Sequence, residues 1–167
     1  MSVLFSPKGG VASKLIGLIA QAKKSVDIAI YSFTNGDVSK ALITAAHSGV
    51  LVRVVMDKNQ TNGSQAKIHD ALVAGGVQVR LLSPSGGIMH NKFTIVDGRL
   101  VETGSYNYSY NAENVNCENA LFPVKSKLDA AYWARFEKLW LLSTTEDKSF
   151  LRIRRFLRRI TQPSRFL

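Results

Sequence analysis

The chain has 167 residues but only one cysteine, Cys117, so an intramolecular disulfide is excluded. Two of its three histidines, His47 and His69, lie apart from any pattern of cysteines or carboxylates, so the sequence predicts no metal site and no cofactor. No apolar run is long enough to span a bilayer, and the N-terminus lacks the basic start and apolar core of a secretory signal. We therefore expect either an intracellular protein in a reducing compartment, the cytoplasm, or a protein whose signal has been removed from this chain.

Acidic residues are also scarce. The chain has 12 Asp and Glu against 22 Lys and Arg, which gives a formal net charge of +10 and a pI near 10.0. This balance favours a polyanionic partner, because binding such a partner releases its condensed counterions. Hydrophobic residues make up 46% of the chain, which is ordinary for a folded soluble domain.

The basic residues are concentrated near the C-terminus. Residues 148–167 contain seven Lys and Arg and no acidic residue, and their apolar side chains recur at helical spacing. We therefore divide the chain into a domain over residues 1–144 and a basic amphipathic tail over residues 145–167. The tail would suit a nucleic-acid backbone, an anionic membrane surface or a partner chain. A solvated helix whose apolar side covers the core is the plainer alternative.

Helical and strand periodicities alternate along the chain. The pattern predicts an α/β domain with a mixed β-sheet flanked by helices on both faces. Apolar residues at helical spacing mark residues 11–22, 38–46, 65–74 and 128–139. Apolar runs typical of strands occupy residues 26–33, 50–56, 77–82, 93–96, 100–103 and 118–124.

Residues 90–107 concentrate the side chains with the clearest chemistry. His90 and Lys92 alternate on the strand expected here, so their side chains leave the same face. A neutral imidazole at His90 is suited to attack phosphorus and form a phosphohistidine, while Lys92 is suited to hold the non-bridging oxygens. Taken singly, each has a plainer interpretation, as a surface histidine at a strand entrance and as a solvated cation.

Three further polar residues of this segment also have two interpretations. Asp97 and Gly98 between two strands are typical of a type I′ hairpin turn, and a carboxylate held there can also pair with Lys92. Ser105 and Asn107 are suited to cap a short helix that follows them. The N-terminus of such a helix is, however, also a good place to bind phosphate.

The combination of these residues makes coincidence improbable. His-x-Lys-x4-Asp from residue 90, followed by Gly-Ser-x-Asn from residue 104, resembles the motif of the phospholipase D superfamily. Residues 5–7, 31–34, 102–105 and 118–120 are similar to one subgroup, the small single-motif bacterial endonucleases of the Nuc type. The resemblance extends over residues 3–142, and the basic tail lies beyond it.

The resemblance implies a site built from two identical chains, because each chain has one motif copy. His90 of one chain would be the nucleophile, and His90 of the other would protonate the leaving oxygen and then activate water. Lys92 and Asn107 would hold the phosphate and Ser105 would lend a hydroxyl. Glu118 matches the carboxylate that orients the histidine. Asp97 completes the catalytic set of His90, Lys92, Asp97 and Glu118.

Two coupled imidazoles predict a bell-shaped pH profile.

The sequence therefore predicts a metal-independent phosphodiesterase, a non-specific endonuclease that cleaves DNA or RNA as a homodimer. No base-reading element is recognisable, so weak base specificity is expected. A phospholipase acting on a lipid such as cardiolipin is the main alternative, with the tail in contact with the membrane surface. A non-catalytic module that only grips phosphate is the third.

Overall fold

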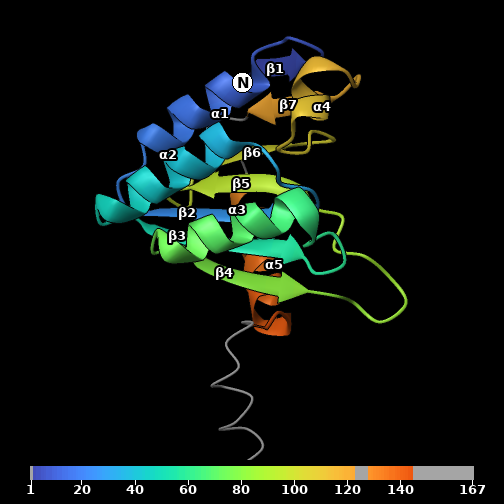
Figure 1. Cartoon of the computed structure of the whole chain (residues 1–167). Helices are drawn as coiled ribbons and strands as arrows, with labels where there is room; N and C mark the ends of the chain where they lie inside the picture. Colours follow the sequence, from blue (N-terminus) through green and yellow to red (C-terminus); the bar gives the residue numbers. More distant parts are fainter. Residues whose placement is uncertain (1, 123–127, 145–167) are drawn as a thin grey trace, which may run out of the picture.

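The computed structural model of the chain describes residues 2–122 and 128–144 (Figure 1). Within these residues one mixed sheet contains seven strands: β1 (Ser2–Phe5), β2 (Ser25–Ile30), β3 (Leu51–Asp57), β4 (Gln78–Leu82), β5 (Lys92–Val96), β6 (Leu100–Gly104) and β7 (Asn119–Phe122). The helices described are α1 (Val11–Ala20), α2 (Gly36–His47), α3 (Gly63–Ala74), α4 (Tyr110–Asn114) and α5 (Leu128–Leu142). The predicted tail, residues 145–167, lies outside the described residues.

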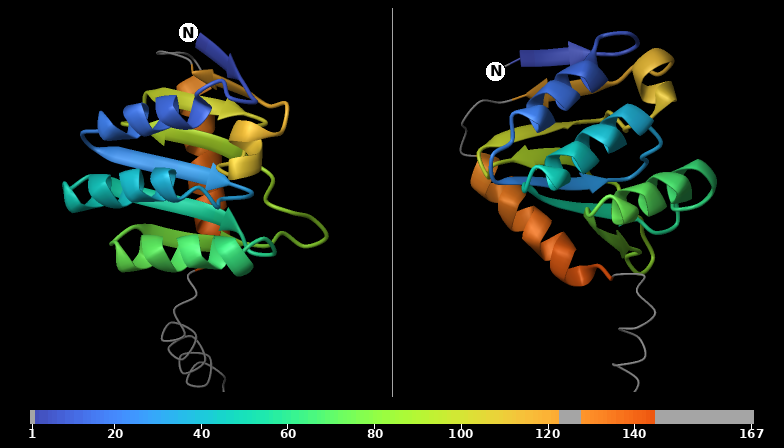
Figure 2. Two further views of the ribbon diagram at one scale, coloured as in Figure 1. Left: turned by 45° about the horizontal axis from the view of Figure 1, so that its top comes forward. Right: turned by 60° about the vertical axis from the view of Figure 1, so that its left-hand side comes forward.

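The strands follow the order β1-β7-β6-β5-β2-β3-β4 across the sheet. β2, β3 and β4 run parallel, whereas the neighbours from β2 through β5, β6 and β7 to β1 are antiparallel. Helices α1, α2 and α3 cover one face and α5 crosses the other (Figure 2). The predicted α/β architecture, a mixed sheet with helices on both faces, is confirmed.

Each face of the sheet has its own apolar core. On β3, Val54 belongs to the cluster under α1–α3, whereas its neighbour Val55 belongs to the cluster under α5, with Phe136 of that helix. Because side chains alternate along a strand, a strand buried on both faces is apolar at nearly every position. This explains why β2 and β3 were recognisable in the sequence as continuous apolar runs.

The N-terminal strand β1 was not predicted. Its four residues, Ser-Val-Leu-Phe, alternate between half-buried and exposed and are too few to give a clear periodicity. Its pairing with β7, from Ser2 opposite Phe122 to Phe5 opposite Asn119, makes it a strand. Tertiary contact thus decides the structure of this segment, as is usual for a short edge strand.

The antiparallel pairings place the predicted site residues at two different ends of the sheet. At one end Lys92 lies opposite Ile30, and Gly104 lies opposite Ala120. At the other end Val96 lies opposite Val26, so that Asp97 follows beyond it. No helix among the described residues is both long and apolar enough to span a membrane.

Candidate active site

His90 and Lys92 meet where the chain enters β5. His90 is exposed, whereas Lys92 is only 7% exposed. The Lys92 Nζ lies 3.2 Å from Nε2 and 3.3 Å from Nδ1 of His90, and it donates to the His90 carbonyl oxygen at 3.0 Å. An anion bound at the imidazole would therefore lie close to the ammonium.

Tyr31, directly after β2, packs against this pair. Its ring centroid lies 4.5 Å from that of His90, and the Lys92 Nζ lies 5.2 Å from the Tyr31 ring. Burial lowers the pKa of Lys92, and the negative charge of Glu118 opposes this shift. The ammonium thus occupies a partly desolvated position, where its attraction for an anion is stronger than in water.

Ser105, directly after β6, lies against Glu118, directly before β7. The Ser105 hydroxyl donates to Glu118 Oε2 and accepts the backbone N–H of Asn119 at 3.1 Å. Glu118 Oε1 accepts from Nδ2 of Asn116 at 3.1 Å. No hydrogen bond joins Glu118 to His90 in the described part of this chain, so the predicted role of Glu118 in orienting a histidine stays a prediction.

The motif glycine and Asn107 shape the same end of the sheet. A Cβ at Gly104 would collide with the carbonyl oxygen of Asn119, so glycine is needed where these two segments approach. Oδ1 of Asn107 accepts the backbone N–H of Ser32 at 3.2 Å. Its Nδ2 has no partner among the described residues and is available to donate to a ligand.

The helix-cap interpretation of Ser105 and Asn107 is wrong. Helix α4 begins only at Tyr110, and the side chain of Ser109 caps it by accepting the N–H of Ala112 at 3.1 Å. Ser105 and Asn107 lie before this helix and make the contacts described above. Their side chains are therefore not used in holding a helix end.

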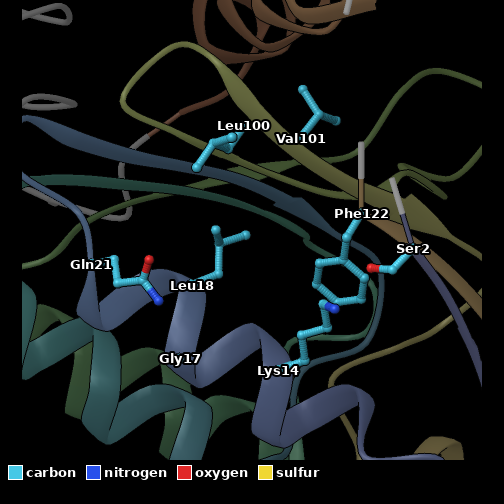
Figure 3. Close-up of a pocket in the computed structure, with 8 residues that line it drawn as sticks. All are labelled: Ser2, Lys14, Gly17, Leu18, Gln21, Leu100, Val101 and Phe122. Carbon is cyan, nitrogen blue, oxygen red and sulfur yellow. The ribbon is translucent and has the colours of Figure 1, made fainter. Parts of the chain in front are cut away.

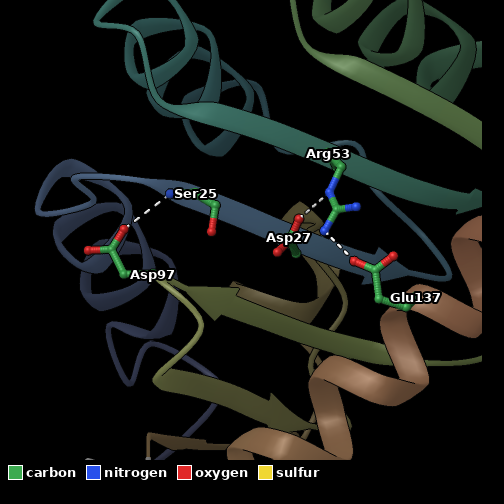
Figure 4. A network of polar contacts seen from close by, with 5 residues as sticks. All are labelled: Ser25, Asp27, Arg53, Asp97 and Glu137. Atoms are coloured by element: carbon green, nitrogen blue, oxygen red, sulfur yellow. Dashed lines mark hydrogen bonds and ion pairs between the residues drawn. The ribbon is translucent and has the colours of Figure 1, made fainter.

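Asp97 lies apart from the other predicted catalytic residues, which corrects its assignment to the site. Its carboxylate accepts the backbone N–H groups of Lys23, Lys24 and Ser25 at 2.7–3.2 Å. Figure 4 shows the bond from Ser25. Asp97 and Gly98 have φ of 53° and 66°, as a type I′ turn requires. The turn reverses the chain at the end of β5 opposite to Lys92, so the carboxylate cannot pair with it.

A family model described as "Cardiolipin synthase, PLD-like domain" matches residues 15–140 of the chain. The chain belongs to the phospholipase D-like family. The resemblance inferred from its motif is thereby confirmed, and with it the assignment to a family of phosphodiesterases that act as hydrolases.

Relatives of this phospholipase D-like chain have differing names. It is 33% identical over 128 residues to the "Mitochondrial cardiolipin hydrolase" of Chlamydomonas reinhardtii, covering 77% of this chain and 56% of the relative. It is 30% identical over 132 residues to a "Phospholipase D" of Rickettsia prowazekii, covering 79% of this chain and 63% of the relative. The chain thus spans less than two thirds of the length of these relatives.

Among solved structures, the phospholipase D family member Nuc from Salmonella typhimurium matches with a TM-score of 0.79 and 32% identity. The match covers 86% of this chain and 95% of Nuc. NucT from Helicobacter pylori matches with a TM-score of 0.77 and 29% identity, over 86% of this chain and 96% of NucT. The fold of this phospholipase D-like domain is that of Nuc.

Two buried polar residues that the sequence did not single out hold the loops of the phospholipase D-like site. Gln65 of α3 accepts the backbone N–H of Phe33 at 2.6 Å and donates to the Tyr31 carbonyl at 3.4 Å. Asp57, at the end of β3, accepts the backbone N–H of Met89 at 2.8 Å, next to His90. For Asp57, the sequence offered one signal of such a role, which is an acidic residue at the end of an apolar strand. For Gln65 it offered none.

A cavity of about 480 Å³ lies elsewhere, between α1 and strands β1, β6 and β7 (Figure 3). Ser2, Gln21 and Leu100 line it, and the Lys14 ammonium lies 5.2 Å from the ring of Phe122 in its wall. None of the predicted site residues lines this cavity. Within the described residues, no three His, Cys, Asp or Glu side chains gather as metal ligands.

Proposed function

We propose that this chain is a metal-independent phosphodiesterase that cleaves nucleic acid as a non-specific endonuclease, in a homodimer. The contact between His90 and Lys92 carries the proposal, because it joins a nucleophile to a phosphate-binding cation. The endonuclease is favoured because the chain covers 95% of Nuc but only 56% of the Chlamydomonas cardiolipin hydrolase. A basic chain, with a net charge of +10, also suits a polyanion.

In the proposed reaction, a ring nitrogen of His90 attacks phosphorus and forms a phosphohistidine. The bond from phosphorus to the leaving oxygen breaks, and His90 of the second chain gives that oxygen a proton. The same second imidazole then takes a proton from water, which attacks phosphorus and releases His90. Lys92 and Nδ2 of Asn107 from both chains donate to the non-bridging oxygens, and Ser105 lends its hydroxyl.

Exposed apolar side chains around Glu118 support the dimer. Phe5, opposite Asn119 in the β1–β7 pairing, is 63% exposed, Tyr110 at the start of α4 is 71% exposed, and Val115 is 61% exposed. Exposed apolar side chains of this size favour contact with another protein surface. Two chains that meet there would bring their His90 residues to one site.

Light scattering and activity of a Tyr110→Lys variant test the dimer. We expect a dimer for the wild-type chain and a monomer with strongly reduced cleavage for Tyr110→Lys, because a charge is costly in an apolar interface. Leu51→Lys is the matched control, since Leu51 is 45% exposed but begins β3 at the opposite end of the sheet. A fully active wild-type monomer would refute the shared site.

Cleavage of single-stranded DNA, double-stranded DNA and RNA in EDTA tests the chemistry. Cleavage should persist in EDTA and fall by roughly 10³-fold or more in His90→Ala, because the nucleophile is removed. His47→Ala, at the exposed end of α2, should keep the wild-type rate. Tight binding of nucleic acid with no turnover in either protein would instead indicate a phosphate-binding module.

A phospholipid substrate is the second candidate, favoured by the name of the relatives that are 33–35% identical, "Mitochondrial cardiolipin hydrolase". The same His90 chemistry would serve it. Hydrolysis of cardiolipin in vesicles, without cleavage of any nucleic acid, would establish this function. Vesicle co-sedimentation that is lost on deletion of residues 145–167 would assign the tail to the membrane surface.

A further inference from the structure

A carboxylic acid is buried beneath the candidate site. Glu102 lies on β6 with no exposed surface, opposite Thr94 of β5, which is also fully buried. Cross-strand partners share a face of the sheet, and Lys92 lies two residues before Thr94 on that face. Glu102 is thus placed under α1–α3, directly behind the residues proposed to meet phosphate.

The bonds of Glu102 are unusual for a buried carboxylate. The Tyr108 hydroxyl donates to its Oε2 at 2.9 Å, and the same Tyr108 hydroxyl is hydrogen-bonded to Oγ1 of Thr94. Oε1 has no hydrogen-bond partner, and no cation pairs with the group, within the described part of the chain. Burial raises the pKa of Glu102 from its ordinary 4.5 to about 8, which favours the neutral acid at pH 7.

The three hydrogen-bonded side chains come from the three segments that carry the site. Thr94 follows Lys92 on β5, Glu102 precedes Ser105 by three residues, and Tyr108 follows Asn107 directly. The backbone of Tyr108 also ties these segments to the β2–α2 loop: its N–H donates to the Ser32 carbonyl at 3.1 Å, and its carbonyl accepts from Thr34 and Asn35 at 2.8 and 2.9 Å.

We propose that Glu102 is a positioning residue, which acts through Tyr108 and Thr94 to fix Asn107 and Ser105 relative to Lys92. An apolar side chain of similar volume would fill the same space without the cost of burying a carboxyl group. An apolar side chain would not, however, accept the hydrogen bond that fixes the position of Tyr108, and with it the position of the neighbouring Asn107 amide. The neutral acid also adds no negative charge beside a bound phosphodiester.

The proposal depends on the proposed roles of Lys92 and Asn107 at phosphate, but not on the choice between nucleic acid and lipid. It is therefore tested with bis(p-nitrophenyl) phosphate, a generic phosphodiester. Glu102→Gln keeps the acceptor for Tyr108 and should retain the wild-type kcat and KM. Glu102→Leu should fold but lose roughly 10- to 100-fold in kcat with a smaller change in KM, because small misplacements are costly in catalysis.

Asp27→Asn is the matched control, since Asp27 is another buried carboxyl group, on the opposite face of the sheet and in contact with Arg53. It should lower the urea midpoint and leave kcat unchanged. Full kcat in a folded Glu102→Leu protein would overturn the proposal. If Glu102→Leu does not fold, the Tyr108→Phe variant tests the proposal instead, because it removes only the hydroxyl that bonds Glu102 and Thr94. An unchanged kcat in Tyr108→Phe would also overturn the proposal.

A second readout needs no catalysis. The Nδ2 amide signals of Asn107 in an NMR spectrum should shift when inorganic phosphate is added to wild type and to Glu102→Gln, and this shift should be lost in Glu102→Leu. An equal shift in all three proteins would overturn the positioning role. Phosphate binding without any cleavage in wild type would instead refute the proposed function and leave the test of Glu102 intact.

Discussion

The ring of Tyr31 lies against the imidazole of His90, with 4.5 Å between the ring centroids, and also faces the ammonium of Lys92. One aromatic side chain therefore limits the movement of both groups proposed to act on phosphate. The Tyr31 hydroxyl has no hydrogen-bond partner among the described residues, so the ring, and not the hydroxyl, is in contact with the site.

Two substitutions of Tyr31 should distinguish the contribution of its ring from that of its hydroxyl. Tyr31→Phe should keep kcat within about 2-fold, whereas Tyr31→Ala should reduce it by roughly 10-fold, because His90 then samples unproductive orientations. The measurement is kcat for bis(p-nitrophenyl) phosphate. Equal losses in the two variants would show that the hydroxyl is required.

Glu118→Gln should change the pH dependence of activity. Burial lowers the pKa of Lys92 and the Glu118 charge raises it, so removing that charge lowers the pKa of Lys92 further. The ammonium is then lost at a lower pH, so the loss of kcat/KM caused by its deprotonation, beyond the limb set by the two imidazoles, should move towards neutral pH. Asp37→Asn, whose side chain is 77% exposed on α2, is the control. If the alkaline dependence of kcat/KM does not move in Glu118→Gln, the proposed electrostatic coupling between Glu118 and Lys92 is refuted.

Asp97→Asn should affect stability and not catalysis. Burial alone would raise the pKa of Asp97, but hydrogen bonds from the backbone of Lys24, Ser25 and Lys23 lower it overall. Its stabilisation is therefore present above the ordinary pKa of 3.8 and is lost as the pH falls through the lower folded value.

At pH 7 the Asp97→Asn variant should lose about 1–2 kcal/mol in urea unfolding, because solvent exposure reduces the ~1.5–3 kcal/mol typical of hydrogen bonds to a charged group. The difference from wild type should shrink as the pH falls below about 4. Asp70→Asn, with a side chain 80% exposed, is the control and should change neither the stability at pH 7 nor its dependence on pH. A large loss of kcat at unchanged stability would return Asp97 to the active site.

The ion pair of Arg53 with Asp27 beneath α5 should contribute far more than a surface pair (Figure 4). Arg53 Nε donates to Asp27 at 2.7 Å and its Nη2 to Glu137 of α5 at 2.7 Å, and the Asp27 side chain is 3% exposed. Arg53→Met leaves this carboxylate buried and unpaired, so we expect a loss of about 3 kcal/mol at pH 7.

Urea unfolding of three variants checks this prediction. Lys40→Met breaks the Lys40–Asp37 pair, whose side chains are 79% and 77% exposed, and should cost less than about 0.5 kcal/mol. Adding Asp27→Leu to Arg53→Met should restore much of the lost stability. Equal losses for the buried and the exposed pair would contradict the expected effect of burial.

The sequence was sufficient for the fold class and for the contact between His90 and Lys92. Helical and strand periodicities depend on local spacing, so ten of the described elements, all except β1 and α4, could be recognised from residue order alone. The pairing of His90 with Lys92 follows from their separation by one residue, and this contact is present in the structure.

The distance of Asp97 from His90 and the surroundings of Glu102 and Tyr31 could not be predicted from the sequence, for one physical reason. Motif spacing placed Asp97 with His90, but a strand of five residues carried it to the opposite end of the sheet. Among the described residues, the lack of a cation paired with Glu102 and the contact of Tyr31 with His90 both depend on β5 lying between β2 and β6. Local pattern and residue chemistry determined most of the elements, and they identified the side chains that have the chemistry to act on phosphate. Strand order, which arises from contacts distant in sequence, decided which of those side chains meet.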